Sequence, residues 1–392
     1  MRSLAGTPVF LIGIGGSGMA PLAKFAAQAG AVVSGSDRGI GDAPAARLTE
    51  LGARVFRAHA RENLEVLFES RPGPLPLIVY STAIAPDHIE RAAGQAFADA
   101  GRARLLHRMD FLNECFRHVP EALCVAGTHG KTSSSSMTGW VLLRLGLDPH
   151  IIVGGQPLYL PEGIRCGDAS TRTGACETDE SDGSFLKAEP GLRLVLNVDR
   201  DHLDHYGDFA TLCQAFGDFI QRGELCALNA VDPELVKIAC GLSAAQAASE
   251  STPQLVGFAA GEALDTQEPG AAREEEAAGA GVWPLGLPLY LGEFVGASDR
   301  VRVTLPASQR ALSTELQLRM PGRHFASNAL GVFALIDASV RAGRLRCPDY
   351  TPERAIAALN EFPGVERRMQ LLGEHRLQTL GPVFLVHLLR AR

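Results

Sequence analysis

Short apolar runs alternate with longer stretches of helical spacing through the first part of the chain. Residues 9–12 form an apolar run that predicts a buried strand, and residues 19–29 place apolar side chains at helical spacing. Further strands are predicted at 31–34, 53–56 and 77–80. This alternation predicts a parallel sheet flanked by helices, which is the α/β class.

The alternation resumes after Pro120, which is the predicted boundary between two domains. Residues 123–126 predict a buried strand followed by a helix to Leu145, and residues 102–116 predict a helical connector before the boundary. Further elements are predicted at 192–198, 215–228, 301–305, 315–318, 321–340 and 352–359.

The predicted organisation is two α/β domains and a short tail, which 392 residues allow at ~150 residues per domain. We expect a Rossmann-like domain over 1–119, a P-loop-type ATPase α/β domain over 120–368 and a tail over 369–392. Residues 265–281, rich in alanine, glycine and glutamate, predict a flexible insertion in the second domain.

Composition excludes several classes of protein. Hydrophobic residues make up 46% of the chain, which supports packed cores, and the net charge of −7 argues against binding nucleic acid or a membrane surface through bulk charge. No run approaches the ~18 apolar residues of a membrane span, and the N-terminus is a poor secretory signal. The eight cysteines lack the spacing of a zinc site, so we expect free thiols and a cytoplasmic protein.

A glycine turn at 127–132 follows one predicted strand and opens a predicted helix. This arrangement is typical of a phosphate-binding loop, in which backbone N–H groups and the helix dipole face an anion. Lys131 is expected to reach the outer phosphates, and the Thr132 hydroxyl to ligate Mg²⁺. Val125 stands where the full pattern has glycine, so the motif is shortened, and the alternative is a glycine turn with a solvated lysine.

A second glycine turn, at 13–18, lies between a predicted strand and helix, and Asp37 follows the next strand. This is a dinucleotide-type fingerprint, in which the glycines admit a pyrophosphate and the acidic side chain bonds a ribose hydroxyl. The pattern does not identify the nucleotide. Residues 81–84 follow another strand at the carboxyl edge, where open sheets bind ligands, or they form a loop without contacts.

Acidic side chains cluster after the phosphate loop. Residues 177–182 contain four carboxylates, and residues 201–206 add aspartates and histidines beyond the strand predicted at 192–198. Carboxylates near a phosphate loop suit Mg²⁺, a hard cation that takes oxygen ligands. The alternative is a solvated acidic loop.

Taken together, five ordered motifs resemble the Mur ligases, a family of ATP-dependent amide-forming enzymes of peptidoglycan assembly. The motifs lie at 13–19, 127–132, 177–185, 201–207 and 321–324. The resemblance covers about residue 8 to about residue 370. It implies that the first domain binds UDP-N-acetylmuramate rather than NAD.

The resemblance also implies the residues of the site. Those expected at the UDP-sugar are Gly15, Gly16, Ser17, Gly18, Met19, Asp37, Ser81, Thr82, Ala83 and Ile84. Those expected at ATP are Gly127, Thr128, His129, Gly130, Lys131, Thr132 and Ser133, with His324 and Asn328 at the adenine and Arg367 or Arg368 at the γ-phosphate. Thr132 and Glu177 are expected to hold one Mg²⁺, and Glu177 and His202 a second. The implied catalytic set is Lys131, Glu177, His202 and Arg367.

The implied reaction joins L-alanine to the sugar nucleotide. The lactyl carboxylate attacks the γ-phosphate of ATP to give an acyl phosphate, from which the alanine amine displaces phosphate. Because two anions must approach each other, cations dominate such a site. The runs at 180–185 and 201–206 favour the alanine-adding branch of the family over the branch that attaches a tripeptide. A third possibility, an NAD dehydrogenase, leaves Lys131 and the carboxylates without a role.

The chain departs from the family pattern at several points. Phe325 replaces an asparagine beside the adenine position, serines at 133–136 replace threonines, and Val231 stands where an acidic residue is common. Residues after about 372 match nothing in the family, whose third, Rossmann-like domain holds the amino acid. We therefore expect that domain to be missing, through a truncation such as a frameshift. The alternative function is an inactive protein that binds ATP and the UDP-sugar.

Overall fold

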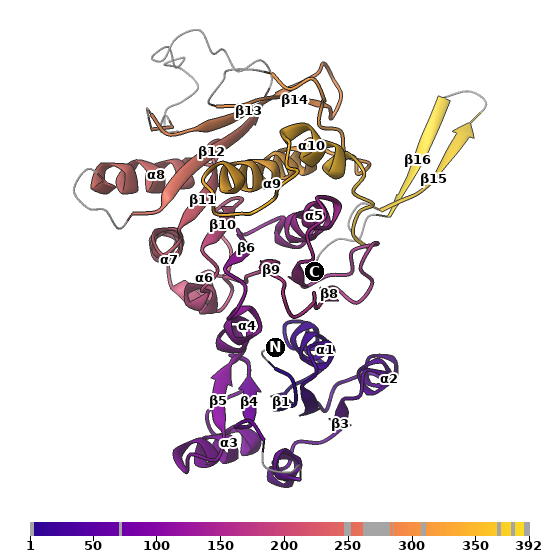
Figure 1. Cartoon of the computed structure of the whole chain (residues 1–392), viewed down its shortest axis with the longest axis vertical. Coiled ribbons are helices and arrows are strands. Elements are labelled where there is room, and N and C mark those ends of the chain that lie inside the picture. Colours follow the sequence, from indigo (N-terminus) through magenta and orange to yellow (C-terminus); the bar gives the residue numbers. More distant parts are fainter. Residues whose placement is uncertain are drawn as a thin grey trace.

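The computed structural model describes residues 4–69, 73–246, 252–261, 283–284, 286–306 and 311–366, and the backbone of 370–377 and 381–387. Among these residues, two α/β units follow one another along the long axis of the molecule (Figure 1). The N-terminal unit carries a five-stranded sheet and the second unit a nine-stranded sheet. The predicted α/β class, with a parallel sheet in the N-terminal unit, is confirmed.

The N-terminal sheet is parallel and has the strand order β3-β2-β1-β4-β5. Its strands are β1 Pro8–Ile12, β2 Val32–Ser36, β3 Arg54–Phe56, β4 Leu77–Tyr80 and β5 Arg104–His107. Its helices are α1 Ala20–Gln28, α2 Asp42–Glu50, the 3-10 helix η1 Arg61–Phe68, α3 Ile89–Asp99 and α4 Arg108–Phe116. The order reverses between β1 and β4, so the loops after these two strands flank the switch point at which open sheets bind ligands.

The helical connector predicted over 102–116 is wrong in its first half. Residues 104–107 form β5, which pairs with β4 in parallel, and α4 begins only at Arg108. The His107 side chain accepts a hydrogen bond from the backbone N–H of Met109 and so caps α4. An N-cap residue has extended backbone. The cap at His107 therefore separates β5 from α4, a boundary that the spacing of apolar residues does not indicate.

The second sheet has the order β14-β13-β12-β11-β10-β6-β9-β7-β8 and is parallel except at the pairs β13–β14 and β7–β8. Its strands are β6 Glu121–Ala126, β7 His150–Ile152, β8 Ile164–Arg165, β9 Thr173–Glu177, β10 Leu192–Val195, β11 Leu225–Asn229, β12 Gln254–Gly261, β13 Leu289–Phe294 and β14 Val301–Thr304. Its helices are α5 Lys131–Arg144, the 3-10 helix η2 Ser184–Lys187, α6 Leu203–Tyr206, α7 Phe209–Gln221, α8 Pro233–Gln246, α9 Arg323–Arg341 and α10 Pro352–Asn360. Helices α5, α9 and α10 share one apolar cluster, and α7 and α8 contribute to another.

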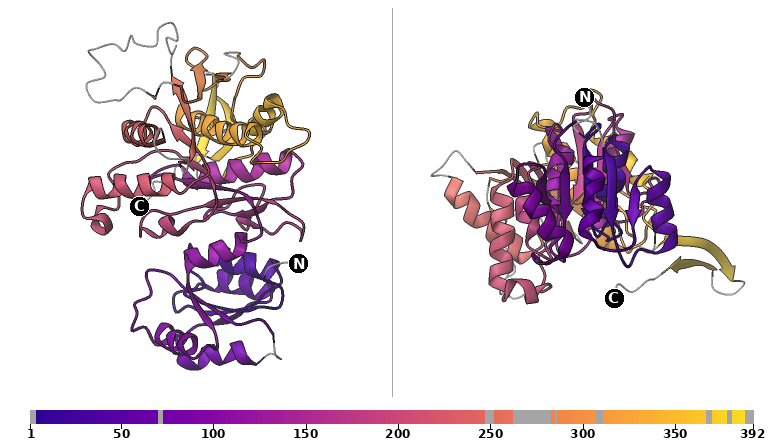
Figure 2. Two further views of the ribbon diagram at one scale, coloured as in Figure 1. Left: turned by 60° about the vertical axis from the view of Figure 1, so that its left-hand side comes forward. Right: turned by 90° about the horizontal axis from the view of Figure 1, so that it is seen from below.

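Two predictions about the later part of the second domain have other outcomes. Residues 315–318, expected to be an ordered element of unspecified type, form an isolated bridge between Leu316 and Val301. The insertion predicted at 265–281 lies outside the described residues. The tail includes the antiparallel pair β15 Gln370–Leu377 and β16 Gly381–His387, which projects from the second unit (Figures 1 and 2).

Helices α1 and α4 lie against the second unit (Figure 1). The ring of Phe25 on α1 stacks on Phe116 of α4, with centroids 6.4 Å apart, and meets the His150 ring of β7 edge-on at 5.1 Å. Glu162 of the second unit forms ion pairs with Lys24 at 2.9 Å and with Arg47 at 2.7 Å. One buried apolar cluster spans both units, so they share a core.

All eight cysteines lie within the described residues as free thiols. Buried thiols were expected, but only Cys115, Cys124, Cys176 and Cys226 are buried, and Cys240 is exposed. No helix in the described part of the chain is long and apolar enough to cross a membrane.

We predict that Phe25→Ala destabilises the protein by about 3–5 kcal/mol, because the side chain is buried where the two units meet and its removal leaves a cavity. Chemical denaturation measures this loss. Val231→Ala, at an exposed apolar position, is the control and should change stability by less than ~0.5 kcal/mol. Equal effects of the two substitutions would show that Phe25 does not couple the units.

Candidate active site

The glycine turn at 127–132 connects the fully buried strand β6 to helix α5, as predicted for a phosphate loop. Gly130 adopts the left-handed conformation, with φ 85°, just before the helix. A Cβ at this position would lie 2.5 Å from Nδ2 of Asn328, so the turn accepts only glycine. Asn328, predicted at the adenine, is therefore in contact with the phosphate loop.

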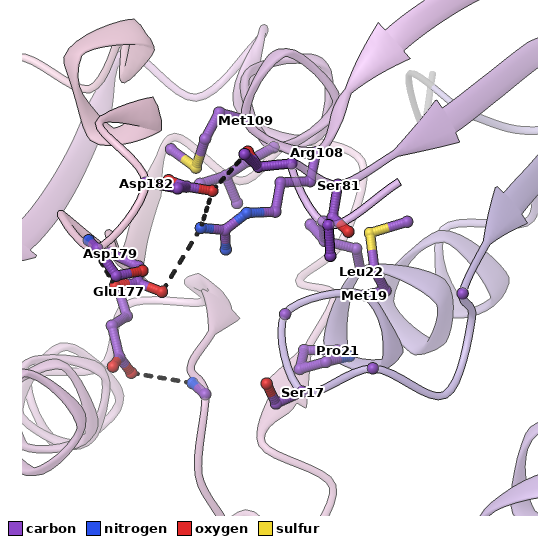
Figure 3. A pocket seen from close by; sticks show the side chains of 18 of the residues that line it. Ser17, Met19, Pro21, Leu22, Ser81, Arg108, Met109, Glu177, Asp179 and Asp182 are labelled. Carbon is purple, nitrogen blue, oxygen red and sulfur yellow. Dashed lines mark hydrogen bonds and ion pairs between the residues drawn. The ribbon is translucent and has the colours of Figure 1, made fainter. Parts of the chain in front are cut away.

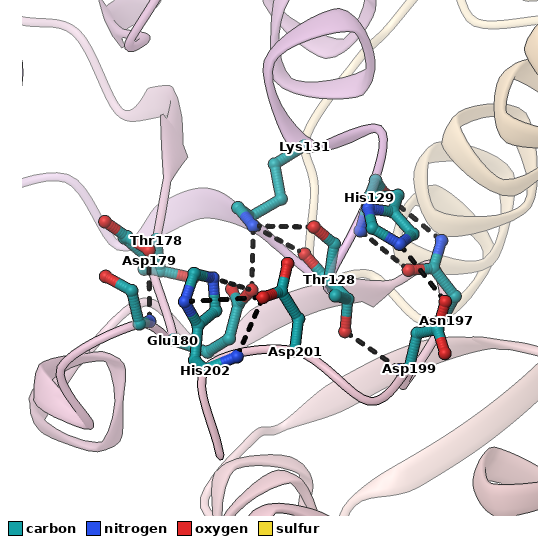
Figure 4. Close-up of polar contacts among 12 residues, drawn as sticks. Thr128, His129, Lys131, Thr178, Asp179, Glu180, Asn197, Asp199, Asp201 and His202 are labelled. Carbon is teal, nitrogen blue, oxygen red and sulfur yellow. Dashed lines mark hydrogen bonds and ion pairs between the residues drawn. The ribbon is translucent and has the colours of Figure 1, made fainter. Parts of the chain in front are cut away.

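Lys131 is folded back onto the loop that carries it (Figure 4). Its Nζ donates to the backbone carbonyls of Gly127 at 2.8 Å and Thr128 at 3.1 Å, and to Glu180 Oε1 at 2.9 Å. The lysine ammonium is thus fully engaged by oxygen atoms. A phosphate oxygen offers the same kind of acceptor to the same donor.

Glu180 belongs to the acidic cluster at 177–182 that the sequence suggested for Mg²⁺, but it was given no role of its own. Its side chain is only 1% exposed, and its Oε2 has no hydrogen-bond partner among the described residues. Burial raises the pKa of Glu180, although the charge and hydrogen bond of Lys131 act in the opposite direction. A buried carboxylate with an unused oxygen beside a phosphate loop is a polar group that a ligand can satisfy.

Thr132 and Glu177, the two residues expected to hold one Mg²⁺, lie in contact with each other. Thr132 Oγ1 donates to Glu177 Oε1 at 3.0 Å, and Glu177 Oε2 accepts the backbone N–H of Gly154 at 3.0 Å. Neighbouring oxygens in an octahedral Mg²⁺ shell of ~2.1 Å bonds lie about 3 Å apart. The oxygen donors and their spacing therefore fit Mg²⁺.

His202 lies beside Glu180 and Asp201 (Figure 4) and fits the expected second Mg²⁺ less well. Its Nε2 is 3.8 Å from Glu180 Oε1, and its backbone has a φ of 55°. Among the described residues it is the only non-glycine residue with positive φ, a strained conformation that is frequent at functional sites. The contacts of His202 are with Glu180 and Asp201 rather than with Glu177, and imidazole is not a preferred ligand of Mg²⁺.

The remaining residues predicted at ATP are distributed around the loop. His129 is exposed and lies 3.2 Å from Asp199, while Thr128 Oγ1 accepts the backbone N–H of Asp199 at 2.9 Å. Ser133 is buried in the first turn of α5.

His324 packs its ring on Phe325, and burial lowers the pKa of His324. Arg367 and Arg368 lie outside the described residues, so their roles stay predictions.

A cavity of about 740 Å³ lies between the two units (Figure 3). Most of the residues predicted at the UDP-sugar line it, and so do Lys131 and Glu177 from the other unit. The predicted UDP-sugar residues in the lining are Gly16, Ser17, Gly18, Met19, Asp37, Ser81, Thr82, Ala83 and Ile84. Gly15 is absent from the lining because its backbone lies against Asp37, whose Oδ2 accepts the N–H of Gly15 at 3.0 Å.

Arg108 belongs to the predicted connector at 102–116, to which sequence reasoning assigned no role in the site, and the structure places it in the cavity wall between two carboxylates (Figure 3). Its Nη2 lies 3.2 Å from Asp182 Oδ2 and 3.5 Å from Asp179 Oδ2. Thr82 Oγ1 donates to the same Asp182 oxygen at 2.7 Å. The polar contacts therefore join the 81–84 loop and α4 of the first unit to the acidic segment of the second.

Comparison with known proteins agrees with this arrangement. The model described as "Mur ligase family, catalytic domain" matches residues 8–118, and the model described as "Mur ligase middle domain" matches residues 125–258. The chain belongs to the Mur ligase family.

Two curated relatives are both named UDP-N-acetylmuramate–L-alanine ligase. The protein of Pelotomaculum thermopropionicum is 34% identical over 93% of this chain and 68% of its own length. That of Stenotrophomonas maltophilia is 32% identical over 93% of this chain, which spans 65% of that relative. The crystal structure of UDP-N-acetylmuramate-alanine ligase MurC from Thermotoga maritima has a TM-score of 0.65 at 25% identity, covering 94% of this chain and 71% of that one.

Asp182 gives a pH-dependent contribution to stability. Burial raises the pKa of Asp182, but hydrogen bonds from Ser184 and Thr82 and the charge of Arg108 outweigh it and lower the pKa to about 2. Since this value lies below that of the unfolded chain, the stabilisation is complete above about pH 4 and is lost as the pH falls towards about 2.

We predict that Asp182→Asn lowers the free energy of unfolding by roughly 2 kcal/mol at pH 6 and by progressively less as the pH falls below 4. Denaturant titrations over this pH range measure the difference. The control Asp204→Asn, at an exposed carboxylate, should stay within ~0.5 kcal/mol of the unmodified protein throughout. A pH-independent effect of Asp182→Asn would contradict the assigned ion pair.

Proposed function

We propose that this chain is an ATP-dependent ligase of peptidoglycan synthesis that joins L-alanine to UDP-N-acetylmuramate in the cytoplasm. The observation that carries the proposal is the 740 Å³ cavity lined both by the glycine turn at 13–18 and by Lys131. A sugar nucleotide on the first turn and ATP on the second would share this cavity, so that their reacting ends can meet. The names of the two curated relatives support the choice of substrates.

Lys131 holds the outer phosphates of ATP in this proposal. In the structure its ammonium is balanced by Glu180 and two backbone carbonyls. When the phosphates bind, they replace these acceptors and the lysine stabilises the charge that builds up as the γ-phosphate is transferred. The N-terminus of α5 adds backbone N–H groups directed at the same anion.

Thr132 and Glu177 are the residues that would hold Mg²⁺, since their oxygens have the required hardness and spacing. The ion supplies positive charge that neutralises the phosphates when bound. The backbone N–H of Gly154 fixes the Glu177 carboxylate, which keeps the ligand oriented.

Arg108 is proposed to bind the sugar nucleotide. It lies in the cavity wall beside the 81–84 loop, and its guanidinium has the geometry to bind phosphate or carboxylate oxygens at two points. Asp179 and Asp182 hold it in place. The lactyl carboxylate then attacks the γ-phosphate, and the alanine amine displaces phosphate from the resulting acyl phosphate to form the amide.

The direct test incubates the purified chain with ATP, Mg²⁺ and UDP-N-acetylmuramate, and adds either L-alanine or the tripeptide used by the recycling branch of the family. Phosphate release and the mass of the product are followed. We expect amide formation with L-alanine. ATP binding without any amide product contradicts the ligase proposal, and better turnover with the tripeptide contradicts the choice of amino acid.

We predict that Lys131→Ala lowers the turnover number by about 10²–10³-fold, because it removes one cation from the site of phosphoryl transfer. Binding of UDP-N-acetylmuramate, measured by calorimetry, should remain within twofold. Lys237→Ala removes an exposed lysine of α8 and serves as the matched control. Comparable losses in both variants would indicate a general effect of charge rather than a role in the phosphate loop.

Arg108→Ala should weaken UDP-N-acetylmuramate binding by roughly 10–100-fold, the effect of losing a charge-assisted hydrogen bond of about 1.5–3 kcal/mol. ATP binding should change little. The matched control is Arg117→Ala, because Arg117 follows the opposite end of α4 and is exposed. Unchanged affinity of Arg108→Ala for the sugar nucleotide would exclude Arg108 from that site.

A further inference from the structure

A cluster of two histidines and a glutamate lies in the N-terminal unit and has no role in the reaction proposed above. His59 follows β3, and His88 and Glu90 lie at the start of α3. Both elements are labelled in the N-terminal unit of Figure 1. One ligand atom from each of the three side chains lies within 4.8 Å of the other two, and in the described part of the chain no other group of three His, Cys, Asp or Glu side chains meets this condition.

We propose that His59, His88 and Glu90 form a binding site for a divalent transition metal ion of the Zn²⁺ type. Two imidazole nitrogens and one carboxylate oxygen are a common ligand set for Zn²⁺, which leaves a further position of a tetrahedral shell for water. Imidazole ligands favour Zn²⁺ and its neighbours over Mg²⁺. The site is therefore chemically distinct from the oxygen pair at Thr132 and Glu177.

The distances suit such an ion. His59 Nδ1 lies 2.9 Å from Glu90 Oε2, and the His59 and His88 ring centroids are 4.6 Å apart. Ligands at ~2.0–2.2 Å in a tetrahedral zinc site lie about 3.3–3.5 Å from one another. A metal shell would therefore need His59 Nδ1 and Glu90 Oε2 to separate slightly, while the three ligand atoms, now within 4.8 Å of one another, adjust to a common ion.

The buried ring nitrogen of His88 is not accounted for by hydrogen bonding. The pair of His59 and Glu90 is already a satisfactory hydrogen bond, but His88 Nδ1 is buried and has no hydrogen-bond partner in the described part of the structure. His88 stands at the N-cap of α3, yet its side chain does not cap the helix. A metal ion would satisfy this nitrogen.

The carboxylate is held as a metal ligand requires. Glu90 is fully buried, its Oε1 accepts from Asn63 Nδ2 at 2.8 Å and from the N–H of Ala60 at 3.2 Å, and its Oε2 accepts from Ser36 Oγ at 2.5 Å. Such outer hydrogen bonds orient a ligating group. The bound ion would tie the ends of β2 and β3 to the start of α3.

The test titrates the full chain with Zn²⁺ by calorimetry, after removal of metals with a chelator and in an excess of Mg²⁺ that occupies the oxygen site. We expect one tight site, at least tenfold weaker binding in His88→Ala, and no change in His118→Ala, which removes an exposed histidine. Substitution with Co²⁺ should give the visible absorption of a tetrahedral ion in the unmodified protein and not in His88→Ala.

Thermal unfolding provides a second readout, because an ion that binds the folded state raises the melting temperature. Zn²⁺ should raise it in the unmodified chain and in His118→Ala but not in His88→Ala. If His88→Ala is itself unstable without metal, His88→Gln replaces it. The absence of stoichiometric binding, or equal binding by the His88 variants, would overturn the proposal.

Discussion

The contact between Lys131 and Glu180 is the interaction on which the arrangement of the site depends. It joins the phosphate loop after β6 to the segment after β9, the strand beside it in the sheet. Because Glu180 is buried, its charge is poorly solvated and depends on the lysine for compensation. The acidic segment is therefore held beside the loop, and with it Glu177 beside Thr132.

The same segment also reaches the other unit. Asp179 and Asp182 lie within ion-pair distance of Arg108, and Asp182 accepts a hydrogen bond from Thr82. Apolar contacts around Phe25 hold the units together at a distance from these charges. Packing thus brings the units into contact, while the polar contacts align the walls of the cavity.

The sequence pattern alone was sufficient to predict the features that depend on residues close together along the chain. The strand, glycine turn and helix around Lys131 are encoded within one short stretch, so the loop could be predicted from its own residues. The pairing of Thr132 with Glu177 was implied by the resemblance to the Mur ligases. Arg108 and Glu180 could not be assigned roles, because these depend on side chains far along the chain. The boundary of α4 was missed for a similar reason, since β5 is defined by its pairing with β4. Gly15 was predicted at the ligand, but its packing against Asp37 is the contact that the structure provides.

The acidic segment at residues 179–182 balances the charge of the cations in the cavity wall, a role that the sequence alone did not indicate. Lys131 and Arg108 are the two cations in the cavity wall among the described residues, and each is paired with a carboxylate from residues 179–182. In the proposed reaction between two anionic substrates, both cations would be needed, and substrate oxygens would take the places that these carboxylates occupy. Both cations are held by one short segment, since Glu180 contacts Lys131 while Asp179 and Asp182 contact Arg108. The acidic segment is in this way a physical connection between the two parts of the cavity.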